Sequence, residues 1–139
     1  MTATECREAC AAAIVALTPD SMADRTHVFW ERRPGTAPSG RRGFVLSPAD
    51  GPFRDEDLLE SCGWWWLPLR LEVLYDGGDD AMDVAVEDMQ DIVDALDDLD
   101  ASTAGIQRVE IDYRDIESDE NTGAARIEIG FRAQYDTNI

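Results

Sequence analysis

The sequence predicts an α+β fold, with an antiparallel sheet of about four to five strands, two helices packed on one face, and an extended hairpin or loop arm. Two segments, 3–17 and 79–99, carry apolar residues at helical spacing. Three segments in the second half alternate apolar and polar residues, as half-buried strands do. Their order along the chain is typical of helices packed on an antiparallel sheet.

Length and composition indicate one domain over residues 1–139, with an arm or loop at 31–63 inside it. Hydrophobic residues make up 44% of the chain, which is enough for a packed core. No apolar run reaches the ~18 residues of a membrane helix, and the N-terminus lacks the basic start of a signal peptide. We therefore expect a soluble protein without membrane contacts.

The first predicted element is a helix over residues 3–17. Thr4 is the expected N-cap, and Glu5 and Glu8 lie in the first turn, where the helix dipole favours acids. Residues 18–20, with a proline in the middle, end the helix.

The next region predicts an extended hairpin. Residues 26–33 and 41–47 have the composition of short strands, and the loop 34–40 between them is rich in Pro, Gly and Ser. Residues 48–62 are irregular and acidic, with a turn of helix expected at 56–61.

Four arginines flank the loop of this predicted hairpin: Arg32, Arg33, Arg41 and Arg42. If the hairpin forms, they gather near its tip as the one basic patch of an acidic protein. They are either counter-charges on a solvated loop, or a docking arm for an acidic neighbour such as another copy of this chain.

Three consecutive tryptophans, Trp64, Trp65 and Trp66, cannot all point into one core. On a strand they alternate between faces, so at least one meets the other side of the sheet, solvent or a partner. Exposed tryptophan is a frequent interface anchor, which makes the three residues interface candidates. The alternative is that they pack under residues 48–62.

The second half predicts a strand over 67–76, a helix over 79–99, and two strands over 106–118 and 125–137 joined by a turn at 118–123. The helix carries an apolar stripe of Met82, Ala85, Met89, Ile92, Val93, Leu96 and Leu99. Val109, Ile111 and Tyr113 are expected on one face of their strand. The predicted core between sheet and helix contains Leu71, Val73, Met89, Ile92, Leu96, Ile111, Ile129 and Phe131.

The polar face of the second helix is a row of acids without a base: Asp83, Glu87, Asp91, Asp94, Asp97 and Asp98. Like charges one turn apart cost a few tenths of a kcal/mol each, which burial of the stripe outweighs. The acids are therefore tolerated but not needed for folding. They form a solvated face, or they face DNA to be repelled or a basic partner. The spacing does not fit an EF-hand, so no calcium site is predicted.

The net charge, the single histidine and the three cysteines argue against nucleic-acid binding, catalysis and metal binding. Thirty acids oppose twelve bases, all arginine, for a net charge of −18, which disfavours specific nucleic-acid binding. The lone His27 has no evident nucleophile or metal partner, so we expect no enzyme, no catalytic residue and no cofactor. Cys6, Cys10 and Cys62 fit neither a disulfide framework nor a metal site, so no metal is predicted.

The order of elements resembles the tail terminator and tail-completion (neck) proteins of long-tailed bacteriophages. The likeness rests on LPLRLEVLYDGGDDAMDVAVEDMQDIVDALDDLD, IQRVEIDYRDIES and ARIEIGFRAQYDT, and covers residues 64–137 well and the N-terminal half loosely. It implies a non-enzymatic virion protein of the tail or neck, made in the host cytoplasm. Its partners would be itself, in a ring of six copies, the tail tube protein, and the head–tail connector or stopper protein. The acidic helix face would then approach the DNA channel.

A second hypothesis belongs to another class. A net charge of −18 and a row of acids are what an acidic monomeric DNA mimic needs to inhibit a nucleic-acid-binding protein. The oligomeric state distinguishes the two hypotheses, because the mimic is a small monomer.

Overall fold

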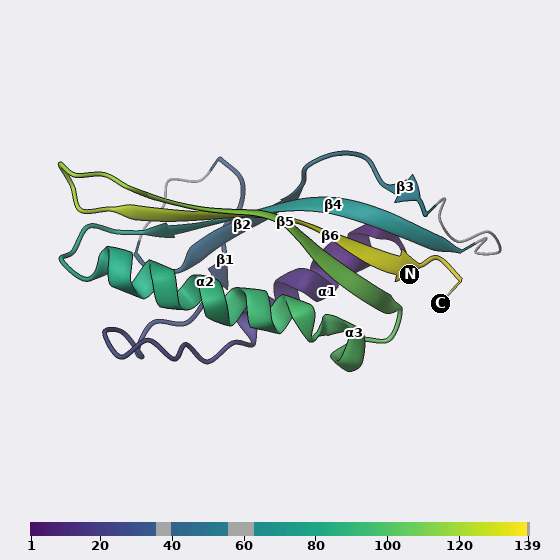
Figure 1. The fold of residues 1–139 in the computed structure, drawn as a ribbon, viewed down its shortest axis with the longest axis horizontal. Coiled ribbons are helices and arrows are strands. Elements are labelled where there is room, and N and C mark those ends of the chain that lie inside the picture. The colour runs from purple at the N-terminus through teal and green to yellow at the C-terminus, as the bar shows by residue number, and fades with distance from the viewer. Residues whose placement is uncertain (36–39, 56–62, 139) are drawn as a thin grey trace.

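A computed structural model describes residues 1–35, 40–55 and 63–138. Its helices all lie against one face of a single twisted sheet, which confirms the α+β class (Figure 1). The helices are α1 (Ala3–Val15), α2 (Ala81–Asp97) and α3 (Leu99–Ser102). The strands are β1 (Trp30–Glu31), β2 (Gly43–Pro48), β3 (Phe53–Arg54), β4 (Trp64–Tyr75), β5 (Ile106–Ser118) and β6 (Ala125–Asp136).

Helix α1 begins with a capping box at Thr2 rather than Thr4. The Thr2 hydroxyl accepts a hydrogen bond from the Glu5 N–H at 3.1 Å, and the Glu5 carboxylate accepts one from the Thr2 N–H. Cys6, Cys10 and Ile14 follow at four-residue intervals and are buried. The two cysteines are therefore part of the hydrophobic core.

The centre of the sheet is a twelve-residue antiparallel pairing of β4 with β6, and β5 pairs with the other side of β6. Alternate residues of β4 face the helices and are buried: Leu67, Leu69, Leu71, Val73 and Tyr75. They pack with β6 and with the buried stripe of α2 in one cluster. Because strand side chains alternate, one face of the central strands forms the core and the other is left to polar residues.

Six of the eight predicted core residues are fully buried. Met89 and Ile111 are only partly buried and pack against the margin of the core. Both residues lie at one side of the molecule, because β5 is an edge strand of the sheet and α2 packs against it. The fully buried core therefore includes fewer residues on the β5 side than the sequence pattern predicts.

The predicted hairpin of 26–33 with 41–47 is wrong. β1 and β2 pair in parallel, with Trp30 opposite Gly43, whereas a hairpin requires antiparallel strands. Most of the predicted first strand is not a strand, because the Asp24 carboxylate accepts hydrogen bonds from the backbone N–H groups of Thr26 and His27. Such a side-chain turn competes with sheet pairing. The helical turn expected at 56–61 lies outside the described residues.

A bulge in β5 reverses the predicted direction of Tyr113. The register shifts between Ile111 and Tyr113, so that Tyr113 pairs with Gly130 and lies on the polar face instead of the core face. The ring lies directly over Gly130, where a Cβ atom would collide with it. In the described part of the chain, no helix is both long and apolar enough to span a membrane.

Candidate functional site

Arg42, a predicted surface arginine, lies in the interior with its side chain fully buried. Its guanidinium donates to both carboxylate oxygens of Asp88, from Nε at 2.7 Å and from Nη2 at 2.8 Å. Its Nη1 donates to the His27 carbonyl at 2.7 Å, and the Tyr75 hydroxyl donates to Asp88 Oδ2 at 2.7 Å. The buried charges are thus paired and hydrogen-bonded, which a buried ion pair requires.

This buried pair changes the pKa values around it. Burial would lower the pKa of Arg42, but the hydrogen bonds and charge of Asp88 outweigh burial and raise it. Burial, and then the negative charge of Asp88, raise the pKa of the Tyr75 hydroxyl well above its usual range. Arg42 therefore stays charged and Tyr75 stays a hydrogen-bond donor, as expected of a structural cluster.

Arg41 completes the ionic contacts at the N-terminal end of α2. Its Nη1 donates to Asp24 at 3.3 Å and to Asp80 at 3.2 Å, and its Nη2 also pairs with Asp80. Asp24 additionally contacts His27 Nδ1 at 2.9 Å. Asp80 is the N-cap of α2 but makes no capping hydrogen bond, and its carboxylate pairs with Arg41 instead.

The pKa of the Asp24 carboxyl group is shifted by its neighbours in this cluster. Burial raises its pKa, but hydrogen bonds from His27, from the Thr26 and His27 N–H groups and from the Thr26 hydroxyl together hold the pKa well below its usual range. Its ionised form is therefore favoured in the folded state. The cluster ties residues 24–27 to β2 and to α2.

The four arginines consequently do not form one patch. Arg32 is buried and approaches Glu72 at 3.5 Å on the sheet face opposite the helices, while Arg33 is exposed. Arg41 and Arg42 contact acids of α2 on the other side of the sheet. The parallel pairing of β1 with β2 separates these residues, which a hairpin would have brought together.

The tryptophans divide between the two faces of β4, as alternation predicts. Trp65 packs against the core, whereas Trp66 lies on the opposite face and is buried at the position that pairs with Phe53 of β3. The Trp66 indole donates to Asp55 at 3.0 Å, and the Arg132 guanidinium lies 4.8 Å from its ring centroid. Trp66 therefore matches the packing alternative, and Trp64 is partly exposed.

The sheet face opposite the helices, here called the outer face, carries ion pairs across β4, β6 and β5. Arg126 of β6 contacts Glu72 at 3.0 Å and Glu117 at 2.8 Å, and Arg132 contacts Glu110 at 2.6 Å. The Glu117 and Glu72 hydrogen bonds raise the pKa of Arg126. Cross-strand charge pairs of this kind contribute modestly to sheet stability and leave a polar surface.

The acidic row of α2 is mostly exposed. Asp83, Glu87, Asp94, Asp97 and Asp98 lie on the surface, and none of them pairs with an arginine of the described residues. Asp91 differs, because it is half-buried and accepts a hydrogen bond from the Asp20 N–H at 3.1 Å. Burial raises the pKa of Asp91, although the Asp20 N–H opposes the shift.

Sequence reasoning missed Asp88, the acid that holds Arg42. The signal was available, since Asp88 falls at core spacing among Ala81, Val84, Ala85, Ile92 and Leu96. An acid at a core-facing helix position requires a buried partner. The partner itself could not be identified, because several arginines were equally available.

Comparisons with known proteins give a likeness in fold, but none in sequence family. No family model matches this sequence, and no curated protein matches it. Within the described residues, no group of three or more His, Cys, Asp or Glu side chains is arranged to hold a metal ion. The chain is similar in fold to a chain of a solved structure described as the virion of a native gene transfer agent (GTA) particle, with a TM-score of 0.52, 19% identity, and 76% of each chain covered.

Proposed function

We propose that this protein is a structural component of a phage-like particle and acts as a tail terminator, forming a ring that caps the tail tube and joins it to the head–tail connector. The observation that carries the proposal is the fold shared with a chain of a gene transfer agent virion over 76% of both chains. The resemblance of residues 64–137 to tail terminator proteins supports the same assignment. The role is structural and requires no catalysis or cofactor.

The surfaces of the molecule suit a subunit of such a ring. In the described residues, the outer face of β4, β6 and β5 is not covered by a helix and carries paired charges, which suit a wet contact between proteins (Figure 1). The acids of α2 form a separate surface. In the proposed ring they line or approach the channel and repel the DNA phosphates, so that the genome passes without binding.

The test is removal of the gene from the genome that encodes the particle. Electron microscopy is expected to show filled heads and separate tails, with tube lengths no longer limited. Expression of the wild-type chain in trans restores joined particles. Mass spectrometry of purified normal particles detects the chain at a few copies per tail, far below the tube protein. Complete, joined particles without the gene, or particles that lack the chain, contradict the proposal.

One observation favours the DNA-mimic alternative, namely the five exposed and unpaired acids of α2 within the described residues. A DNA mimic is a monomer that binds a basic protein with steep salt dependence and is absent from particles. Light scattering of the purified protein, together with mass spectrometry of particles, therefore separates the two functions.

A further inference from the structure

Two opposite edges of the sheet are open in the described residues. The strand order is β1-β2-β4-β6-β5, so β1 ends the sheet on one side and β5 on the other. An edge strand leaves half of its backbone N–H and C=O groups without a partner in the sheet, which makes it a natural contact site for another chain. Both edges also carry exposed apolar side chains.

The edge at β5 is flanked by one side of α2, and the two together carry the apolar side chains here called the β5 flank: Met82, Val86, Met89, Val93, Ile111 and Ile116. On this face of β5, the exposed Arg114 lies between Ile111 and Ile116. Val86 is 53% exposed and Met82 is 37% exposed, although both continue the apolar side of an amphipathic helix. The remaining four residues are half-buried at the margin of the core. The apolar stripe of an amphipathic helix normally faces the core of its own monomer rather than solvent.

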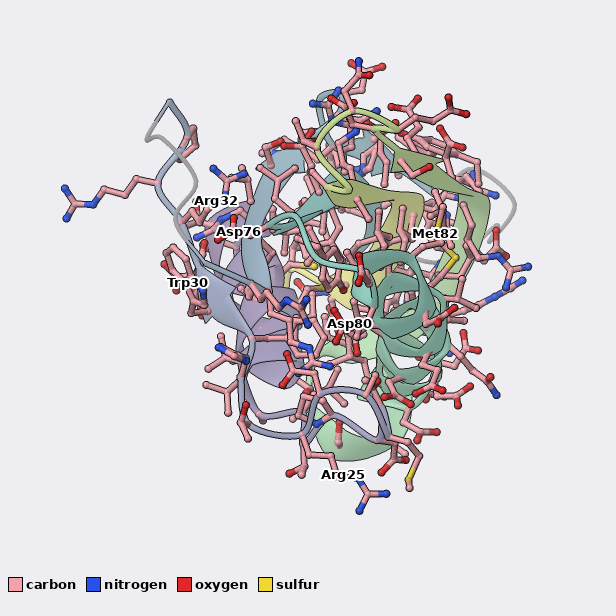
Figure 2. All side chains as sticks on the ribbon, turned by 90° about the vertical axis from the view of Figure 1, so that its left-hand side faces the viewer. Arg25, Trp30, Arg32, Asp76, Asp80 and Met82 are labelled. Carbon is pink, nitrogen blue, oxygen red and sulfur yellow. The ribbon has the colours of Figure 1, made fainter. Side chains whose placement is uncertain are left out.

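The opposite edge presents Val28 and Trp30, here called the β1 flank. Val28 is 61% exposed and Trp30 is 37% exposed, while Phe29 between them is buried. The Trp30 indole donates to the Arg41 carbonyl at 3.0 Å, so the ring is held in place before any contact forms. Figure 2 shows Trp30 and Met82 on opposite sides of the molecule, the first beside β1 and the second between α2 and β5.

Charge distinguishes the two flanks. The segment 25–33 that contains β1 has three arginines and one acid in a chain of net charge −18. Arg32 is buried near Glu72, so the exposed bases of this segment are Arg25 and Arg33. Helix α2 has six acids and no base, and Asp83 and Glu87 directly follow Met82 and Val86. The β1 flank is thus complementary in charge to the surroundings of the β5 flank, whereas either flank facing itself would bring like charges together.

We propose that the β1 flank of one copy docks on the β5 flank of the next copy, with Trp30 as its anchor. This inference rests on the proposed ring and names the contact that builds it. Because the two flanks are different surfaces on opposite sides of the subunit, the contact is head-to-tail and propagates until a ring closes. A fixed tryptophan in an apolar surface is a frequent centre of binding energy.

The experiment uses one variant for each flank. Val28→Asp and Val86→Asp place a charge in the proposed contact, and neither position is buried in the monomer. Val and Asp have similar helix propensity, so Val86→Asp changes the surface more than the helix. Asn121→Asp, in the exposed turn between β5 and β6, is the control for one added charge away from both flanks. Circular dichroism confirms that each variant folds.

Analytical ultracentrifugation is expected to show closed oligomers for the wild type and Asn121→Asp, and monomers for each flank variant. Each variant raises the dissociation constant of the contact at least about tenfold. An equimolar mixture of the two variants forms a dimer and nothing larger, since one intact flank remains on each chain. Only a head-to-tail contact gives this result.

Several outcomes overturn the inference. If either flank variant still forms the wild-type oligomer, the ring uses other surfaces, while the proposed function stands. A mixture that stays monomeric excludes a head-to-tail contact. A wild-type chain that remains monomeric up to millimolar concentration, yet is found in particles, also rejects this contact. Absence of the chain from particles is the distinct result that rejects the proposed function.

Discussion

At the scale of single residues, Arg42 joins β1, the start of β2 and α2. Its φ of 61° lies in the left-handed region, which few residues other than glycine adopt. Backbone hydrogen bonds on both sides hold it there, since its N–H donates to Leu74 and its carbonyl accepts from Trp30. The side chain then reaches Asp88 across the core. A local turn and a distant ion pair together place β1 alongside β2 in the same direction.

Replacement of Asp88 by Asn is expected to lower the free energy of unfolding by about 3–5 kcal/mol, because it leaves the buried Arg42 without its hydrogen-bonded countercharge and with only Asp24, at 3.8 Å, as a charged partner. Glu87→Gln is the matched control, since it removes the neighbouring but exposed carboxylate and is expected to change stability by less than about 0.5 kcal/mol. Urea denaturation followed by circular dichroism measures both. Equal effects of the two substitutions contradict the structural role of the buried pair.

The lowered pKa of Asp24 predicts that the protein loses stability in acid. Its pKa is lowered in the folded state, so on acidification the unfolded chain takes up this proton first, near its ordinary pKa of about 4. The stabilisation is complete above about pH 4 and declines as the pH falls below that value. Asp24→Asn should therefore be less stable than the wild type by about 1.5–3 kcal/mol at pH 7. In thermal melts the gap should narrow between pH 4 and pH 2; a constant gap would be inconsistent with the lowered pKa.

At the scale of elements, the β5 bulge decides which residues the outer face displays. Without the bulge, alternation would place Tyr113 with Ile111 on the helix side, where α2 packs. With the bulge, the Tyr113 hydroxyl donates to Glu128 at 3.1 Å on the outer face, and its ring covers Gly130. The absence of a side chain at Gly130 is therefore what allows the ring to lie flat on the sheet.

The effect of Gly130→Ala on stability is expected to depend on whether the Tyr113 ring is present. In the wild type, the new Cβ displaces the Tyr113 ring and breaks the hydrogen bond to Glu128, which offsets the gain of about 0.5–1 kcal/mol that alanine normally brings to a strand interior. In a Tyr113→Ser background, Gly130→Ala should stabilise the protein by that amount. A double-mutant cycle in urea measures the coupling, and additive effects would show that the ring does not lie on Gly130.

At the scale of the whole molecule, the charges are divided between the two layers. Arginines of the sheet, such as Arg126 and Arg132, pair with glutamates on neighbouring strands. The exposed acids of α2 face away from the sheet and have no such partners among the described residues. The strands are therefore close to neutral, and the large negative charge is shared between the helices and the segments that connect the elements.

Neutralising this acidic surface tests its proposed position at the DNA channel. The variant changes Asp83, Asp94, Asp97 and Asp98 to Asn and Glu87 to Gln, and leaves Asp91 intact because it accepts the Asp20 N–H. Folding should be unchanged or slightly more stable, since like-charge repulsion along the helix is relieved. Particles should assemble but deliver fewer genomes each, as counted by microscopy and transduction. Normal delivery per particle leaves the acids as a solvated surface, and failed assembly indicates a basic partner docked on them.

The sequence by itself determined the elements that depend on short-range periodicity. The alternation in 67–76 and 125–137 and the helical stripe in 79–99 predicted β4, β6 and α2, together with the residues that form the centre of the core. These patterns work because burial acts on side chains whose direction is set by the local backbone. The tail terminator resemblance rested on the same segments.

The tertiary structure alone decided the direction of β1, the position of Arg42 and the face on which Tyr113 lies. Arg42 and Asp88 are 46 residues apart, and no local pattern states which of twelve arginines neutralises a buried acid. The β5 bulge depends on the contact with Gly130 of the next strand, which periodicity within β5 does not contain. Parallel pairing of β1 with β2 likewise requires the long-range contacts of Arg41 with Asp80 and of Arg42 with Asp88. Each of these features comes from a long-range contact, and a single extra residue or ion pair is enough to reverse what local pattern predicts.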